Sequence, residues 1–184
     1  MGSHHFSMCI DDDIELRLHE DRFAEDFYQL IDRNRQHLRQ WMQWVDDEQS
    51  VDDLLVFMKE SRLQFVHNQG LQASIWYQGQ IVGAIGFHDL DWVDRKVETG
   101  YWLSADQQGK GIVIKACKTL INYAFDELGL NKVEIHCATG NHRSRAIPER
   151  LGFTQEGILR QAQWLYDHYV DMVIYGILAS EWKQ

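Results

Sequence analysis

Cysteine is scarce in this 184-residue chain, and its three copies, Cys9, Cys117 and Cys137, show no C-x-x-C spacing. An odd number of widely spaced cysteines in apolar segments indicates neither a disulfide framework nor a zinc site. We therefore expect a reducing compartment and no bound metal.

Long apolar runs are missing too. No stretch approaches the roughly 20 apolar residues that cross a bilayer, and the N-terminus carries no hydrophobic segment of the secretory type. We expect a soluble, cytoplasmic protein without a membrane partner. The opening residues, MGSHHFSM, are typical of a cloning remnant before a second start at Met8. We therefore expect one domain over residues 9–184 and exclude His4 and His5 from any metal argument.

Positive charge is in deficit, since 18 Lys and Arg face 28 Asp and Glu for a formal net charge of −10. Binding a nucleic-acid backbone relies on clustered basic residues, so direct nucleic-acid binding is disfavoured. A cationic substrate such as an amine fits better. One segment is the exception, because the only charged residues from 107 to 125 are Lys110, Lys115 and Lys118.

Proline occurs once, at Pro148, and no repeat or linker divides the chain. Alternating and helical periodicities predict the order β-α-α-β-β-β-α-β-α-β-β. Strands are expected at 14–18, 71–77, 81–90, 96–103, 133–138, 153–165 and 168–178, and helices at 22–38, 50–68, 113–128 and 144–150.

The most informative stretch is "QQGKGIVIKA", in which two glycines precede an amphipathic helix. A P-loop fails because Lys110 is followed by Gly111 and Ser104 stands where its first glycine belongs. A dinucleotide-binding G-x-G-x-x-G fails because Ile114 replaces the third glycine and the preceding strand ends a meander. Close backbone approach and the free N–H groups of a helix start favour an anion. A tight turn without a ligand is the other interpretation.

Further motifs carry a resemblance. The segments "VETGYWL", "QQGKGI", "KVEIHCATGN" and "NHRSRAIPERLGF", with the tryptophan pair of "LRQWMQW", resemble the Gcn5-related N-acetyltransferase (GNAT) superfamily, and within it the RimJ/RimL-like ribosomal-protein N-terminal acetyltransferases. The resemblance implies an α/β (α+β) fold with a mixed, mostly antiparallel sheet of about seven strands. Helices flank that sheet, and it splays between its fourth and fifth strands.

The resemblance also implies where acetyl-coenzyme A binds. The family signature Q/R-x-x-G-x-G/A falls on the run from Gln108, and Val113 departs from it. Backbone N–H groups of the run would hold the pyrophosphate, the backbone near Tyr101 to Leu103 would carry the pantetheine arm, and Asn141 would bind the arm or thioester. The implied cofactor residues are Tyr101, Trp102, Leu103, Gln108, Gly109, Lys110, Gly111, Ile112, Val113 and Asn141.

Acetyl transfer needs a neutral amine, oxyanion stabilisation and often a proton for the thiolate. By resemblance, the backbone N–H near Leu103 would bind the oxyanion and Ser144 would protonate the thiolate; Ser144 as the N-cap of a short helix is the alternative. The subgroup's catalytic glutamate is matched by Gln163, which cannot accept a proton. Glu98 is therefore our candidate base, with a cross-strand contact to Lys96 or a place on a solvated face as its alternatives. His88 and His168 are weaker candidates.

Three residues are expected at the acceptor: Trp41, Trp44 and Gln163, although a tryptophan pair after a helix also suits a core. Cys137 would flank the thiol end of the cofactor, either as a buried small hydrophobe or, if exposed, as a partner for a mixed disulfide with coenzyme A.

The predicted activity is transfer of acetyl from acetyl-coenzyme A to a primary amine, most simply the N-terminus of a ribosomal or other protein, by direct attack in a ternary complex. A small amine, such as a polyamine or an aminoglycoside-type acceptor, is one alternative. A catalytically silent coenzyme A-binding module is another, because Gln163 leaves no clear base. A homodimer or higher homo-oligomer is left open.

Overall fold

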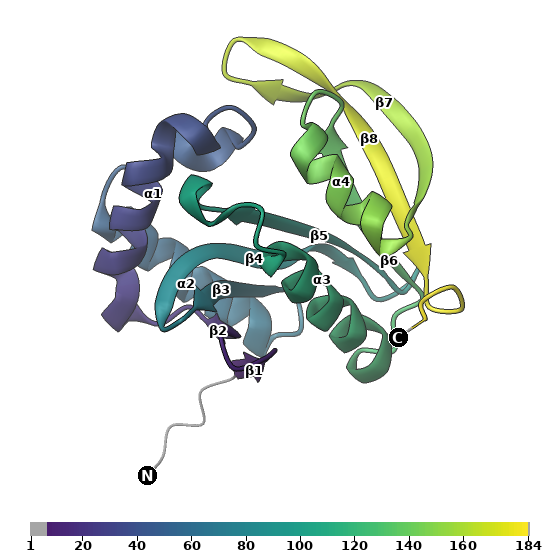
Figure 1. Cartoon of the computed structure of the whole chain (residues 1–184), viewed down its shortest axis with the longest axis horizontal. Helices are drawn as coiled ribbons and strands as arrows, with labels where there is room; N and C mark the ends of the chain where they lie inside the picture. The colour runs from purple at the N-terminus through teal and green to yellow at the C-terminus, as the bar shows by residue number, and fades with distance from the viewer. Residues whose placement is uncertain (1–6, 184) are drawn as a thin grey trace.

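The computed structural model describes residues 7–183, and its centre is one mixed β-sheet (Figure 1). Its eight strands lie in the order β1-β2-β3-β4-β5-β6-β8-β7. Only β5 and β6 are parallel neighbours; the other pairs are antiparallel. The strands are β1 Ser7–Cys9, β2 Ile14–Leu18, β3 Leu71–Tyr77, β4 Gln80–Asp91, β5 Lys96–Leu103, β6 Lys132–Ala138, β7 Thr154–Leu165 and β8 His168–Leu178.

Helices cover both faces of the sheet (Figure 1). They are α1 Ala24–Leu38, α2 Val51–Val66, α3 Ile112–Asn122 and α4 His142–Leu151, with short turns η1 Asp21–Phe23, η2 Gln43–Asp46, η3 Ala105–Gln107 and the π-helical η4 Tyr123–Glu127. Helix α2 begins where Ser50 Oγ accepts the Asp53 N–H at 3.2 Å, as expected for an N-cap serine. No helix within residues 7–183 is long and apolar enough to span a membrane.

Two clusters of buried apolar residues hold the layers together, one on each face. The larger one packs the apolar stripe of α3, including Ala116, Cys117 and Leu120, against the sheet. The smaller one joins α1 and α2 to β4 through Phe27, Leu54 and neighbours. Each helix thus buries one stripe, as an amphipathic helix does when a sheet supplies the partner surface.

The sheet opens between β5 and β6. Their parallel pairing covers only three residues, from Lys96 opposite Lys132 to Glu98 opposite Glu134. Beyond Glu98 the two strands separate, while β6 continues on β8 as far as Ala138. This opening confirms the splayed sheet that the sequence resemblance implied, and it exposes one edge of β5 in the middle of the fold.

The structure adds one strand to the seven expected. Ser7 and Met8, which the sequence analysis assigned to a cloning remnant, pair with Arg17 and Leu16 as part of β1. The expected helix after the glycine loop also divides, because its last turn is π-helical from Tyr123 to Glu127.

Candidate active site

Two cavities meet where the sheet opens. The first, here the loop cavity, has a volume of about 950 Å³ and lies between α3, α4 and the end of β5. The second, here the inner cavity, has about 760 Å³ and lies between β5, β6, the β7–β8 hairpin and the segment after α1. Both are lined by Trp41, Met42, Tyr101, Trp102, Asn141 and Ser144.

The loop cavity is bounded by the glycine segment. Gly109 and Gly111 have φ of +81° and +76°, a left-handed conformation that other residues adopt with strain, and a Cβ on either would meet nothing within 4 Å. Gly111 caps α3 without any side-chain cap. The first N–H groups of a helix lack partners within it, so the start of α3 favours an anion.

The side chains of Gln108 and Lys110, two residues of this loop, point in different directions. Gln108 spans the cavity, because its amide contacts His37 of α1 at 3.0 Å and Arg143 of α4. Lys110 does not line the cavity. Its Nζ donates to Gln107 Oε1 at 2.7 Å and lies over the Tyr77 ring. In this conformation the Lys110 ammonium is directed away from the cavity. Val113, the departure from the family signature, packs partly buried against the larger core cluster and lines the cavity.

Two arginines, Arg143 and Arg150, line the loop cavity together with the imidazole rings of His37 and His142. No Asp or Glu is among the described residues that border it. Together with the start of α3, these residues fit a ligand with a phosphorylated end.

The free edge of β5 supplies backbone groups. Ser104 donates its N–H to Val82 O at 2.8 Å, so by the alternation of an antiparallel ladder Trp102 and Gly100 also face β4. The N–H and C=O groups of Tyr101 and Leu103 then face the opening toward β6. The expectation of a strand-like ladder to an amide arm thus suits Tyr101 and Leu103. It does not suit the backbone of Trp102, whose ring packs on Trp44 and Phe27.

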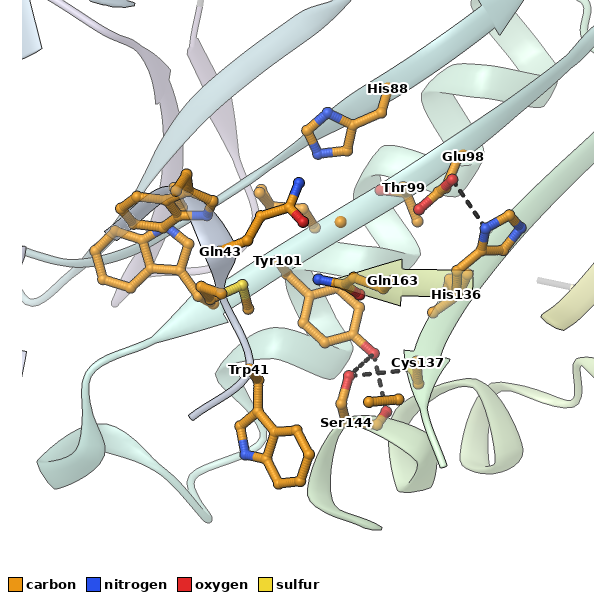
Figure 2. A pocket seen from close by; sticks show the side chains of 18 of the residues that line it. Trp41, Gln43, His88, Glu98, Thr99, Tyr101, His136, Cys137, Ser144 and Gln163 are labelled. Carbon is orange, nitrogen blue, oxygen red and sulfur yellow. Dashed lines mark hydrogen bonds and ion pairs between the residues drawn. The ribbon is translucent and has the colours of Figure 1, made fainter. Parts of the chain in front are cut away.

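Three side chains converge at the junction of the cavities (Figure 2). Ser144 Oγ lies 3.2 Å from Cys137 Sγ and 3.5 Å from the Tyr101 hydroxyl, which donates to Ser144 O at 3.0 Å. Burial is the main cause that raises the pKa of Tyr101 well above its ordinary value and that of Cys137 to about 11. All three are therefore protonated at neutral pH and can act as hydrogen-bond donors.

Asn141, not Ser144, caps α4. Its Oδ1 accepts the Ser144 N–H at 3.2 Å, and Asn141 stands at the N-cap position while Ser144 lies within the helix. The alternative that Ser144 is the N-cap is therefore wrong, and the Ser144 hydroxyl is directed to the junction. Cys137 is only 2% exposed, so it takes the buried form of the two considered for it.

Glu98 lies where β5 and β6 separate, and its carboxylate pairs with His136 rather than with Lys96. Its Oε2 is 3.0 Å from His136 Nδ1 (Figure 2). On the other side of the ring, His136 Nε2 is 3.1 Å from Glu134 Oε2. Burial lowers the pKa of His136, but the hydrogen bonds and charges of Glu98 and Glu134 outweigh it and the net pKa is raised. Glu98 and His136 both line the inner cavity.

The predicted acceptor residues reach the inner cavity. Trp41, Trp44 and Gln163 all line it. The Trp41 ring also packs against Gly140: a Cβ added to Gly140 would lie 3.4 Å from Trp41 Cη2. Trp44 is at the same time partly buried against the smaller core cluster, so it belongs both to the cavity wall and to the core. His88 lines the cavity, whereas the exposed His168 lies outside it, 2.6 Å from Asp167 Oδ1.

Acidic groups line the inner cavity. They are Glu48, Asp89 and Glu98, and no Lys or Arg is among the described residues that border it. Glu48 Oε2 is buried without a hydrogen-bond partner within residues 7–183, and burial, followed by Asp53 and Asp47, raises its pKa. Sequence reasoning missed Glu48 and His136, because neither belongs to a local motif.

A hydrogen bond joins two of the segments that line the inner cavity. Tyr166, in the turn of the β7–β8 hairpin, donates its hydroxyl to Met42 O at 2.6 Å, and Arg39 stacks over its ring at 3.8 Å. The segment after α1 and the hairpin thereby become two connected walls. An elongated ligand with an anionic end and an acyl group at the junction fits the loop cavity, and a cationic group fits the inner one.

Comparison with known proteins agrees with this arrangement of an acyl-transferase fold. Residues 13–154 match the model of the acetyltransferase (GNAT) domain. The chain therefore belongs to the GNAT acetyltransferase family, is an N-acetyltransferase, and uses acetyl-coenzyme A as the acetyl donor.

Relatives span nearly the full chain. A proposed ribosomal N-acetyltransferase of Bacillus subtilis, YdaF, is 39% identical over 97% of this chain and 98% of its own length. The ribosomal-protein-serine acetyltransferase of Escherichia coli is 28% identical over 91% of this chain and 93% of its own. The microcin C7 self-immunity acetyltransferase MccE, solved with acetyl-CoA and AMP, is 31% identical over 92% of this chain and 94% of that one, with a TM-score of 0.89.

Proposed function

We propose that this acetyltransferase modifies the N-terminal amine of a ribosomal protein, by direct attack of the amine in a ternary complex with acetyl-coenzyme A. The names of the Bacillus subtilis and Escherichia coli relatives motivate the acceptor. The observation that carries the proposal in this chain is the opposite charge of two cavities that meet at one junction: cations border the loop cavity and carboxylates border the inner cavity.

The donor side is supported by the loop geometry. Backbone N–H groups from Gly109 to Val113 hold the pyrophosphate, with Arg143 and Arg150 nearby as counter-charges. The edge groups of Tyr101 and Leu103 pair with the amide arm, and the Leu103 N–H is the oxyanion donor. Bound acetyl-coenzyme A supplies the thioester carbonyl that the amine attacks.

The acceptor side is supported by the carboxylates. Glu98 takes the proton of the incoming ammonium, and Ser144 Oγ gives a proton to the departing sulfur. An N-terminal amine has a pKa of roughly 8, so a usable neutral fraction already exists near pH 7 and the demand on the base is modest. Gln163 cannot accept this proton; its amide lies in the same cavity and can hydrogen-bond the peptide.

A small polyamine is the second candidate. The acidic lining suits it, and a spermidine N(1)-acetyltransferase of Vibrio cholerae is 23% identical over 85% of this chain. The two acceptors differ in one respect: a polyamine places a second cation within a few bonds of the first, whereas a peptide continues as a neutral backbone.

Release of free thiol from acetyl-coenzyme A separates these candidates. The panel contains peptides with the N-terminal sequences of ribosomal proteins, the same peptides with a blocked N-terminus and an internal lysine, and spermidine. We expect the free N-termini to give the highest kcat/KM and the blocked peptides to give none. Higher kcat/KM for spermidine would replace the proposed acceptor by the polyamine, and acetylation of the blocked peptides would exclude N-terminal specificity.

A further inference from the structure

The Glu98–His136–Glu134 contact holds a proton on each ring nitrogen of His136. Carboxylates only accept hydrogen bonds, and a neutral imidazole has a single N–H. His136 faces carboxylate oxygens on both sides, at 3.0 Å from Nδ1 and 3.1 Å from Nε2. Both contacts are favourable only when the ring is an imidazolium.

The surroundings of His136 favour this charged form. Glu98 comes from β5, with His88 of β4 in register beside it, and Glu134 precedes His136 on β6. On its far side Glu134 contacts Lys132 at 2.7 Å, and Lys132 contacts Glu156 of β7 at 2.6 Å. The β8 residue in register with His136 is Ile174, which carries no charge. The two carboxylates are therefore the charges that decide the protonation of His136.

The contact also fixes Glu98. His136 and Glu98 are each 24% exposed at the edge of the inner cavity, so the carboxylate has room to rotate unless something holds it. Because Oε2 is engaged by His136 Nδ1, Oε1 is the oxygen of Glu98 that remains available to a group in the inner cavity, which Glu98 lines.

We propose that His136 is a positioning residue: as an imidazolium clamped between Glu98 and Glu134, it orients Glu98 to take the proton of the acceptor ammonium. The inference rests on the proposed role of Glu98 and deepens it. In the step, one N–H bond of the ammonium breaks and one O–H bond forms on the free oxygen of Glu98. The products are a neutral amine and a neutral carboxylic acid, which returns its proton to water.

The clamp gives the reaction an upper pH limit. The pKa of His136 is raised above its ordinary value of about 6.5, so the imidazolium is present below that raised pKa and is lost as the pH rises through it. The neutral ring keeps a single N–H, which Glu98 and Glu134 then share, so the contact to Glu98 is lost in part of the molecules. Deprotonation of the amine favours the reaction as the pH rises, and loss of the clamp opposes it. Wild-type kcat/KM for the acceptor is therefore expected to fall again on the alkaline side.

Two substitutions separate positioning from general structure. An asparagine amide reaches the place of Nδ1 and a glutamine amide reaches that of Nε2, so His136→Asn retains the contact to Glu98 and His136→Gln retains only that to Glu134. We expect His136→Gln to lower kcat by roughly 10- to 100-fold, as misplacement of a reacting group does. His136→Asn should retain most of kcat and lose the alkaline fall, because an amide does not titrate. The exposed His168→Asn is the control.

A second readout does not depend on the acceptor. Histidine proton resonances followed against pH report the pKa of His136 directly, and Glu98→Gln should lower it because one carboxylate is removed. Equal loss of kcat in both His136 variants, an alkaline fall that persists in His136→Asn, or an unchanged His136 titration in Glu98→Gln would each overturn the inference. Failure of ribosomal peptides as acceptors would leave this titration unaffected, so the two proposals fail separately.

Discussion

Cys137 Sγ and Ser144 Oγ lie 3.2 Å apart, which places the helix α4 hydroxyl against the end of β6 at the junction of the two cavities. Strand and helix are joined there by only three residues, and Asn141 caps the helix at that point. The serine is therefore held by the start of its own helix, and its hydroxyl is free to serve the reaction.

Replacing Ser144 by alanine tests that role. Ser144 Oγ does not cap helix α4, so Ser144→Ala should fold normally. The variant should lower kcat by about 100-fold, the low end of the range for a general acid. KM for acetyl-coenzyme A should change little. Steady-state thiol release measures both constants, and Ser144→Thr, which retains a hydroxyl, is the matched control. A kcat of Ser144→Ala equal to that of the wild type would exclude proton donation by this residue.

Gly111→Asp tests the anion site. A carboxylate at the start of α3 would repel the pyrophosphate, so KM for acetyl-coenzyme A should rise at least roughly 10-fold, which corresponds to a repulsion of about 1.4 kcal/mol. Gly79→Asp is a close control, since Gly79 has a φ of +77°, a similarly open Cβ position and a place in the β3–β4 turn. The two variants carry the same charge and backbone strain, so equal KM values would rule out the loop as the binding site.

Cysteine reactivity follows burial. The pKa of Cys137 is raised to about 11 and that of Cys117 is also raised, in both cases mainly by burial, whereas Cys9 is exposed. Thiolates are the reactive form, so an alkylating reagent near pH 8 should modify Cys9 alone in the folded protein and all three cysteines after denaturation. Intact mass and peptide mapping measure the result. Rapid modification of Cys137 in the folded protein would contradict its burial.

His19 should make the fold sensitive to acid. Burial, with a smaller contribution from the charge of Arg62, lowers its pKa to about 4, while Nδ1 stays 2.8 Å from Ser74 Oγ. The unfolded chain binds a proton near pH 6.5 and the folded chain does not, so stability is present above about pH 6.5 and is lost as the pH falls toward 4. Between about pH 7.5 and 4.5 this group should cost roughly 2.5 kcal/mol of unfolding free energy.

Denaturant unfolding at both pH values measures this loss. His19→Asn places an amide near the Ser74 hydroxyl and has no group that titrates in this range, so its stability should fall less over the same interval. His168→Asn, at an exposed position, should behave as the wild type does. A pH dependence of His19→Asn equal to that of the wild type would refute the assignment.

The periodicity and motifs of the sequence predicted those elements whose structure depends on a single segment of the chain. The bounds expected for β3, β5 and β8 agree with the structure, and the glycine loop lies before α3 as its spacing indicated. The family and its splayed sheet followed from short motifs, each of which is contained in a single segment of the chain. The extra strand β1 was missed because Ser7 and Met8 were assigned to a remnant, and no periodicity is visible in three residues.

The pairing of side chains could not be predicted in the same way. Glu98 and His136 come from strands that pair over only three residues, so their contact depends on a register that no sequence pattern specifies. Glu48 lies before α2 and looks like one of several surface acids until the fold buries its Oε2. The roles assigned to Ser144, Glu98 and the loop residues in binding and catalysis remain predictions that the experiments above address.

The Tyr166–Met42 hydrogen bond joins residues 124 positions apart, so one wall of the inner cavity is made early in the chain and its opposite wall near the end. During synthesis the glycine loop and β5 leave the ribosome well before the β7–β8 hairpin does. The residues that line the loop cavity, the last of them Arg150, therefore emerge first, whereas the inner cavity gains its last wall only once the hairpin has docked. A chain that stops short of residue 166 would lose this wall together with β8, whose Val173, Tyr175 and Ile177 belong to the larger core cluster, so the last residues of the chain complete both the site and the fold.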